Sequence, residues 1–168
     1  MCKSCMYKKM FLGYGIIMLF LLFDRQGPDI GAADFFYWEW VSSHLRLQPF
    51  GTTGSFLRLL LTPQEYLSWM EPEAYQASCW HAVKNLVGNV VLFFPLGFFP
   101  PLLWDRCRKL WKTVALAAAI MTIVELAQVL TLRGQCDIDD VILNTLGAAI
   151  GYSLFHLANI NRTQKSSR

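Results

Sequence analysis

Four long apolar stretches, separated by polar segments, dominate the pattern of this 168-residue chain. Each stretch approaches the about 20 residues that an α-helix needs to cross the hydrocarbon core of a bilayer. The pattern therefore predicts an all-α membrane protein, with one membrane domain over residues 1–168. The predicted transmembrane helices are residues 10–23, 86–104, 113–132 and 141–158.

The first apolar stretch is the shortest, and it follows Lys3, Lys8 and Lys9 as the core of a signal peptide would. The small residues 31–33 resemble a cleavage site, but they lie well past the apolar run and beyond Pro28. Lysine and arginine side chains near the end of a short helix can reach the membrane interface, which lengthens the effective span. We therefore favour an uncleaved first transmembrane helix over a signal peptide.

A long loop separates the first two apolar stretches, from residue 24 to residue 85. Residues 34–47 are rich in aromatic side chains and begin with an N-cap candidate, Asp34. This composition is typical of a short helix at the membrane interface, and equally of a packed loop. Residues 58–70 indicate a second short helix that ends before Pro72.

The distribution of charge predicts the orientation. Basic residues cluster near both termini and in the loop after residue 104, whereas the first loop is rich in acidic residues. By the positive-inside rule, both termini are cytoplasmic, and the first loop and the turn near residue 137 face outward. With 54% hydrophobic and 16% charged residues, the composition supports the membrane class. The net charge of +3, without a basic stripe, argues against a nucleic-acid partner.

Several polar side chains interrupt the last three apolar stretches. In the predicted orientation, they all lie at a similar depth in the outer half of the membrane. Carboxylates and amides at this depth are unfavourable, and by default they mark a functional site. We therefore predict a single outward-facing binding pocket, formed by Asn89, Glu125, Gln128, Asp137, Asp139, Asp140 and Asn144.

Three chemical roles are open for this set. Asp137, Asp139 and Asp140 are candidate ligands for a divalent cation such as Mg²⁺, Mn²⁺ or Ca²⁺, which prefers oxygen ligands. Glu125 is a candidate catalytic acid or base. In the structural alternative, Asp137 or Asp139 caps the fourth helix, Asp140 lies in its first turn, and Glu125 makes a polar contact between helices.

Small residues in the fourth stretch indicate close helix packing. Gly147 and Gly151 are four residues apart, with Ala148 and Ala149 between them. Glycines at this spacing lie on one face of a helix and allow a second backbone to come near. We expect packing, and not chemistry, to explain them.

Cysteine and histidine positions add little chemistry. Cys79 and Cys136 both lie on the predicted outer side, where a disulfide can persist, so this pair is either bridged or free. The three histidines have no common spacing, and we expect each to be an ordinary interfacial residue: His44, His81 and His156.

Three segments carry a recognisable combination of motifs: NVVLFFPLG at residues 89–97, ELAQ at residues 125–128, and DIDDVILNTLGAAIGY at residues 137–152. Together they resemble the VanZ-like family of membrane proteins. LQPF at residues 47–50 is similar to a further short motif of that family, so the resemblance covers about residues 45–158. Two features depart from the family: the order Arg133-Gly134, which argues against an essential role for Arg133, and a longer segment at residues 52–84.

The resemblance implies a multi-pass protein of the bacterial cell membrane. The family is named for a bacterial protein associated with low-level resistance to teicoplanin, so the implied setting is the cell envelope. The first functional expectation is a factor that engages an envelope lipid, a glycan precursor or a glycopeptide at the outer leaflet. The alternatives are a small membrane enzyme that acts on a phosphorylated envelope lipid, and a structural or partner-binding helical subunit.

Overall fold

The structure, a computed structural model, describes residues 3–23 and 37–166. Within these ranges, four helices are long and apolar enough to cross a membrane, namely Ser4–Phe23, Pro72–Leu103, Leu110–Leu130 and Ile138–Asn159. This finding confirms the predicted all-α membrane fold with about four transmembrane helices.

Three short helices and one strand precede the second long helix. The elements in chain order are α1 (Lys3–Phe23), α2 (Tyr37–Ser43), β1 (Leu45–Arg46), α3 (Gly51–Leu61), α4 (Pro63–Leu67), α5 (Pro72–Leu103), the 3₁₀ helix η1 (Asp105–Cys107), α6 (Leu110–Leu130), β2 (Cys136–Asp137) and α7 (Ile138–Ser166). The N-cap candidate Asp34 lies outside the described residues, and so do residues 31–33.

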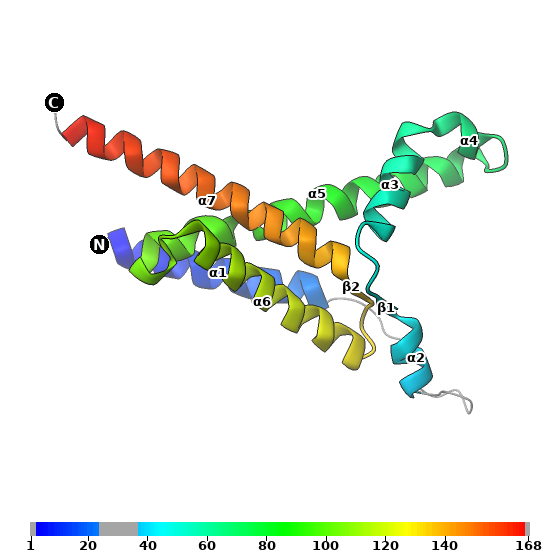
Figure 1. The fold of residues 1–168 in the computed structure, drawn as a ribbon, viewed down its shortest axis with the longest axis horizontal. Coiled ribbons are helices and arrows are strands. Elements are labelled where there is room, and N and C mark those ends of the chain that lie inside the picture. Colours follow the sequence, from blue (N-terminus) through cyan, green and yellow to red (C-terminus); the bar gives the residue numbers. More distant parts are fainter. Residues whose placement is uncertain (1–2, 24–36, 167–168) are drawn as a thin grey trace.

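The long helices extend along the molecule, and α5 crosses α7 (Figure 1). The start of α1 and the end of α7 lie at the same end of the molecule, whereas α2, β1 and β2 lie at the opposite end (Figure 1). A chain that crosses a bilayer four times must have both termini on one side, so this arrangement is compatible with four crossings. Which side is the cytoplasm stays a prediction.

The pairing of α5 with α7 is the most extensive contact between elements. It depends on three glycines, because a methyl group at Gly97, Gly147 or Gly151 would overlap a backbone carbonyl oxygen of the other helix. The predicted packing role of Gly147 and Gly151 is therefore what the structure shows. Closely packed backbones of this kind are typical of helix contacts in membranes, where lipid competes with any looser apolar interface.

The apolar core lies among the four long helices. Phe93 from α5, Met121 from α6 and Ala148 from α7 are almost fully buried. Met18 and Leu22 join this core from α1, whose other apolar side chains are largely exposed. The exposed apolar residues are expected in a bundle that is surrounded by lipid.

The first loop folds into short helices at the end of the bundle opposite the termini. Residues 34–47 contain α2 and β1, and residues 58–70 contain the end of α3 and all of α4. For residues 34–47 a short helix and a packed loop were both open, and the structure has the short helix α2 there; the short helix expected within residues 58–70 is present as α4. Whether these helices lie in the membrane interface stays a prediction.

Candidate functional site

A short parallel strand pair positions the first loop against the start of α7. Leu45 pairs with Cys136, and Arg46 pairs with Asp137. The Cys136 backbone N–H also donates to the carbonyl oxygen of His44 over 2.9 Å. This pairing joins segments about 90 residues apart in sequence, and it brings the side chains of the loop over the acidic turn.

Asp139 provides a second connection to the first loop, through hydrogen bonds at the start of α3. One of its carboxylate oxygens accepts the Phe50 N–H over 2.5 Å, and the other accepts the Thr53 N–H over 2.8 Å. The Thr52 hydroxyl donates to Asp137 Oδ2 over 2.5 Å. The N–H groups in the first turn of a helix have no partner within the helix, and the helix dipole favours an anion there. Asp139 is 1% exposed and occupies this position.

Asp137 and Glu125 hold the turn itself. The Asp139 N–H donates to Asp137 Oδ1 over 2.9 Å, so Asp137 caps α7 as the structural alternative proposed. The Asp137 N–H donates to Glu125 Oε2 over 2.9 Å. Glu125 is 1% exposed, and it therefore links α6 to the start of α7 from inside the protein.

Asp140 connects α7 to α5, and Asn144 lies one turn further along α7. Asp140 Oδ1 accepts the side-chain amide of Asn89 over 2.5 Å and that of Asn85 over 3.4 Å. The Asn144 side chain donates to the Asp140 carbonyl oxygen over 2.6 Å. Three predicted residues thus meet where α5 and α7 pack together.

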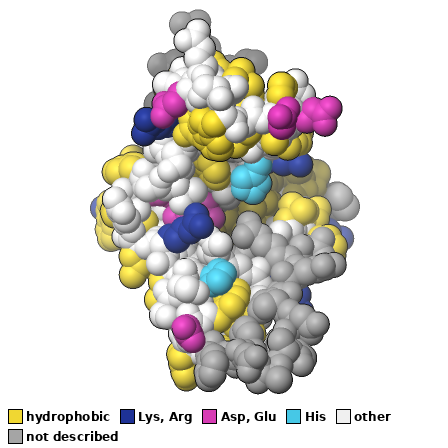
Figure 2. Space-filling model, turned by 90° about the vertical axis from the view of Figure 1, so that its right-hand side faces the viewer, with side chains coloured by type: hydrophobic (Ala, Val, Ile, Leu, Met, Phe, Trp, Pro, Cys, Tyr) yellow, Lys and Arg dark blue, Asp and Glu magenta, His cyan; other side chains and the backbone are white. Residues whose placement is uncertain are grey.

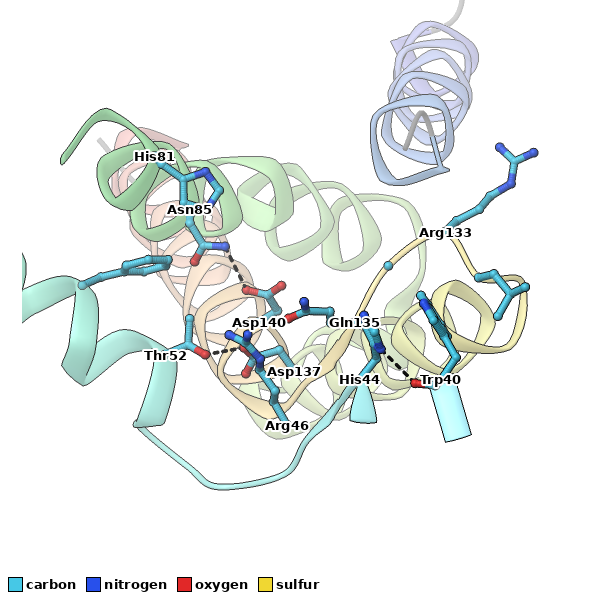
Figure 3. A pocket seen from close by; sticks show the side chains of 13 residues that line it. Trp40, His44, Arg46, Thr52, His81, Asn85, Arg133, Gln135, Asp137 and Asp140 are labelled. Carbon is cyan, nitrogen blue, oxygen red and sulfur yellow. Dashed lines mark hydrogen bonds between the residues drawn. The ribbon is translucent and has the colours of Figure 1, made fainter. Parts of the chain in front are cut away.

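Gln128 is the one predicted residue that turns away from the others. Its side-chain amide donates to the Leu22 carbonyl oxygen of α1 over 2.5 Å. Arg133 also reaches toward α1, because Nη1 donates to the Phe23 carbonyl oxygen over 3.1 Å. Figure 3 shows the Arg133 side chain pointing away from the acidic residues. That Arg133 has no essential role stays a prediction, because Arg133 also lines a neighbouring cavity.

A cavity of about 690 Å³ lies beside this network, between the first loop, α5 and the turn before α7. Asp137 and Asp140 line it and come from the predicted set (Figure 3). The remaining lining residues are Trp40, His44, Arg46, Thr52, Phe56, His81, Asn85, Leu132, Arg133, Gly134 and Gln135. Glu125, Gln128, Asp139, Asn144 and Asn89 do not line it. Whether the cavity binds a ligand stays a prediction.

Most of the lining was not predicted. His44 and His81 were expected to be ordinary interfacial residues, yet both line the cavity. The His44 ring stacks on Trp40 at 3.9 Å between centroids, and the His81 ring meets Phe56 edge-on at 5.7 Å. No spacing rule connects these histidines, because they lie on different elements. The only sequence signal near them was the LQPF motif, which follows Arg46 directly.

Opposite charges meet in the cavity. Asp137 and Asp140 are 6% and 8% exposed, whereas the Arg46 side chain is exposed. Arg46 forms no ion pair with any residue in the described ranges, so its guanidinium remains available. In the view of Figure 2, acidic and basic side chains are seen next to each other near the middle of the face, with histidine side chains above and below them. The cavity can therefore offer hydrogen bonds to both anionic and cationic groups of one ligand.

The proposed metal site needs a correction. Residues 3–23 and 37–166 contain no group of three or more His, Cys, Asp or Glu side chains that could hold a metal ion. Asp137, Asp139 and Asp140 are consecutive or nearly so, but the two oxygens of Asp139 point to the N-terminus of α3 and are used there. The three carboxylates therefore do not converge on one point, and the divalent cation loses its structural basis.

Cys79 and Cys136 are both free thiols, so the disulfide alternative is not what the structure shows. Burial raises the pKa of the Cys136 thiol, and the carboxylates of Glu125 and Asp137 raise this pKa further. A raised pKa leaves less of the reactive thiolate at neutral pH.

We expect iodoacetamide to alkylate Cys136 slowly at pH 7. The alkylation rate should keep rising at pH values at which the rate for free cysteine has already levelled off. The measurement is a mass-spectrometric rate profile of the Cys136 peptide between pH 7 and 10, with free cysteine as the control. A profile that coincides with that of free cysteine would show that the carboxylates do not act on this thiol.

The comparisons with known proteins agree with this architecture. The model of the VanZ/LLP1 family matches residues 11–159. Protein VanZ of Enterococcus faecium is 30% identical over 82 residues, which are 49% of this chain and 50% of that protein. The match to this curated relative thus spans half of its length. No solved structure matches. Because the family model covers most of the sequence, including all four long helices in large part, the chain belongs to the VanZ/LLP1 family.

Proposed function

We propose that this protein acts in the bacterial cell envelope, by binding the polar headgroup of an envelope lipid or glycan precursor in the cavity beside Asp137 and Asp140. The observation that carries the proposal is the cavity itself, which has about 690 Å³. Ligand sites usually measure about 300–1,000 Å³ and combine apolar walls with a few placed polar groups. Here Trp40 and Phe56 supply aromatic walls, and Arg46 supplies a charged group.

The orientation supports an external ligand. Basic residues lie near both termini, and the positive-inside rule then places the termini in the cytoplasm. The cavity is lined in part by α2, β1 and β2, which lie at the end of the molecule opposite the termini (Figure 1), so it faces outward in this orientation. A ligand that is anchored in the outer leaflet could present its headgroup at this height without leaving the membrane.

The geometry favours binding over the proposed enzyme. Glu125, the candidate acid or base, does not line the cavity, and one of its oxygens already accepts the Asp137 N–H. The structural alternative explains Glu125, Gln128 and Asp139, whose hydrogen bonds join elements of the fold. It does not explain why Arg46, an exposed cation without an ion partner in the described chain, lies over the acidic turn.

Lipid co-purification tests the proposal directly. The protein is purified from bacterial membranes in a mild detergent, and bound lipids are identified by native mass spectrometry. We expect a lipid with a large polar headgroup to accompany the wild type. Arg46→Gln and Asp140→Asn should lower its occupancy about tenfold or more, because a hydrogen bond to a charged group contributes roughly 1.5–3 kcal/mol. Asp140→Asn retains an oxygen acceptor for Asn89, so the fold should persist.

Matched controls for this experiment lie outside the cavity. Arg106→Gln and Glu73→Gln remove exposed charges elsewhere, and both should retain the lipid at the level of the wild type. If the cavity variants and the controls bind equal amounts, the proposed headgroup site is wrong. If all variants lose the lipid together with their monodisperse elution, the loss reports unfolding and the structural alternative gains support.

The family connection suggests a cellular readout. We propose that expression of this protein lowers the susceptibility of a bacterial host to teicoplanin. The minimal inhibitory concentration should rise with the wild type and return to the empty-vector value with Asp140→Asn, at equal abundance in membranes. An unchanged inhibitory concentration with the wild type would separate the envelope-lipid proposal from glycopeptide resistance.

A further inference from the structure

An apolar groove of about 450 Å³ runs along α1, at the end of the bundle away from the cavity. Its lining consists of Lys8, Phe11, Leu12, Gly15, Ile16, Leu19 and Trp104. All except Trp104 belong to α1, and they form two neighbouring rows at four-residue spacing. Residues at this spacing share one face of a helix, so the groove is a continuous feature of the helix surface.

The groove borders the side of α1 that packs on the bundle, and Phe11 lies at this border. Phe11 contacts the rings of Phe99 and Trp104, and the Tyr14 hydroxyl donates to the Leu92 carbonyl oxygen over 2.7 Å. Gly15 leaves room in the groove itself, since a methyl group built there would meet no atom within 4 Å. Leu12 and Ile16 beside it are 66% and 62% exposed.

The length of the groove matches one leaflet. Lys8 and Leu19 are eleven residues apart, which corresponds to about 17 Å along a helix with a rise of 1.5 Å per residue. Half of the hydrocarbon core of a bilayer measures about 15 Å. An acyl chain that starts at the height of Lys8 would therefore follow the groove to its end near the middle of the membrane.

The mouth of the groove is positively charged. Lys8 lies there, is exposed, and forms no ion pair within the described parts of the chain. The loop that follows Trp104 also carries Lys109. Tryptophan and lysine together are typical of the headgroup level of a membrane. A phosphate at this height would thus find cationic partners directly above the apolar groove.

We propose that this groove holds one anionic phospholipid, with an acyl chain along Leu12, Gly15 and Ile16 and its phosphate against Lys8. The positive charge of Lys8 makes the groove prefer an anionic lipid over a zwitterionic one. The groove lies toward the end of the molecule that holds the chain termini, and the cavity lies toward the other end. The groove is therefore independent of the proposed headgroup site.

The test uses purified protein exchanged into mixed micelles with equal amounts of phosphatidylglycerol and phosphatidylcholine, followed by native mass spectrometry. We expect the wild type to retain one phosphatidylglycerol. Gly15→Leu adds a side chain to the groove at a position where a Cβ atom meets nothing within 4 Å, and it should reduce retention at least five-fold. Lys8→Gln should reduce the preference for phosphatidylglycerol about five-fold, the effect of about 1 kcal/mol per basic residue near an anionic headgroup.

Each variant has a matched control on the same helix. A methyl group at Gly13 also meets nothing within 4 Å, but Gly13 does not line the groove, so Gly13→Leu should retain lipid as the wild type does. Lys9→Gln removes an equal charge outside the lining. Equal retention by Gly15→Leu and Gly13→Leu, or no preference for phosphatidylglycerol in the wild type, would overturn the proposal. Asp140→Asn should leave this lipid in place even if the cavity proposal fails.

Discussion

Replacing Gly147 by alanine is expected to destabilise the protein by about 3 kcal/mol, because overpacking of a tight interface typically costs 1–3 kcal/mol and here the obstacle is backbone. A Cβ atom at Gly147 would overlap the Val90 carbonyl group of α5, and a backbone group cannot rotate aside as a side chain can. The two helices would have to separate along their most extensive contact. The measurement is the free energy of unfolding in SDS-containing mixed micelles, followed by tryptophan fluorescence.

Gly88→Ala provides the control for this experiment. Gly88 also lies in α5, but a methyl group there would meet no atom within 4 Å. Its replacement should leave stability unchanged or raise it by up to about 1 kcal/mol, since alanine favours a helix over glycine. If Gly147→Ala is as stable as Gly88→Ala, the close approach of α5 and α7 is not a feature of the folded protein.

The hydropathy pattern located the four long apolar helices but not their full extent. The second crossing was predicted at residues 86–104, whereas α5 begins at Pro72. Residues 72–85 include Glu73, His81 and Lys84, so they do not read as a membrane segment, yet they continue the same helix. Apolarity reports which part of a helix lies in lipid, and helix propensity and capping decide where it starts.

The members of the candidate site could be predicted where their depth along the membrane helices was enough to bring them together. Glu125, Asp137, Asp139 and Asp140 were expected together, and hydrogen bonds connect Glu125 to Asp137 and Asp137 to Asp139. Depth does not specify direction around a helix axis, and Gln128 therefore turned out to contact α1.

The residues of the opposite wall of the cavity could not be predicted from residue spacing in the sequence. Arg46 and Thr52 come from the first loop, and the pairing of β1 with β2 places Arg46 beside Asp137. Each strand has only two residues, too few for an alternating pattern to show. Such a long-range contact depends on the whole fold, and the spacing of residues in one sequence carries no signal for it.

Asp139→Ala is expected to lower the free energy of unfolding by about 3 kcal/mol, because it removes the acceptor of two backbone N–H groups and a lost charged partner costs roughly 1.5–3 kcal/mol. Those donors belong to Phe50 and Thr53, which hold the start of α3 against α7. Phe50 adopts a left-handed backbone conformation with φ of 62°, an unfavourable geometry for a bulky residue that its neighbours must maintain. We therefore expect the first loop to detach before the bundle unfolds.

Limited proteolysis distinguishes this local event from global unfolding. Asp139→Ala should be cleaved within residues 45–62 at protease concentrations that leave the wild type intact, while α5, α6 and α7 remain protected. The control is Asp105→Ala, which removes an exposed carboxylate that pairs with Arg108 at the other end of the molecule. Exposed ion pairs contribute roughly 0–1 kcal/mol, so this variant should behave as the wild type. A fully protected loop in Asp139→Ala would show that the strand pair alone fixes it.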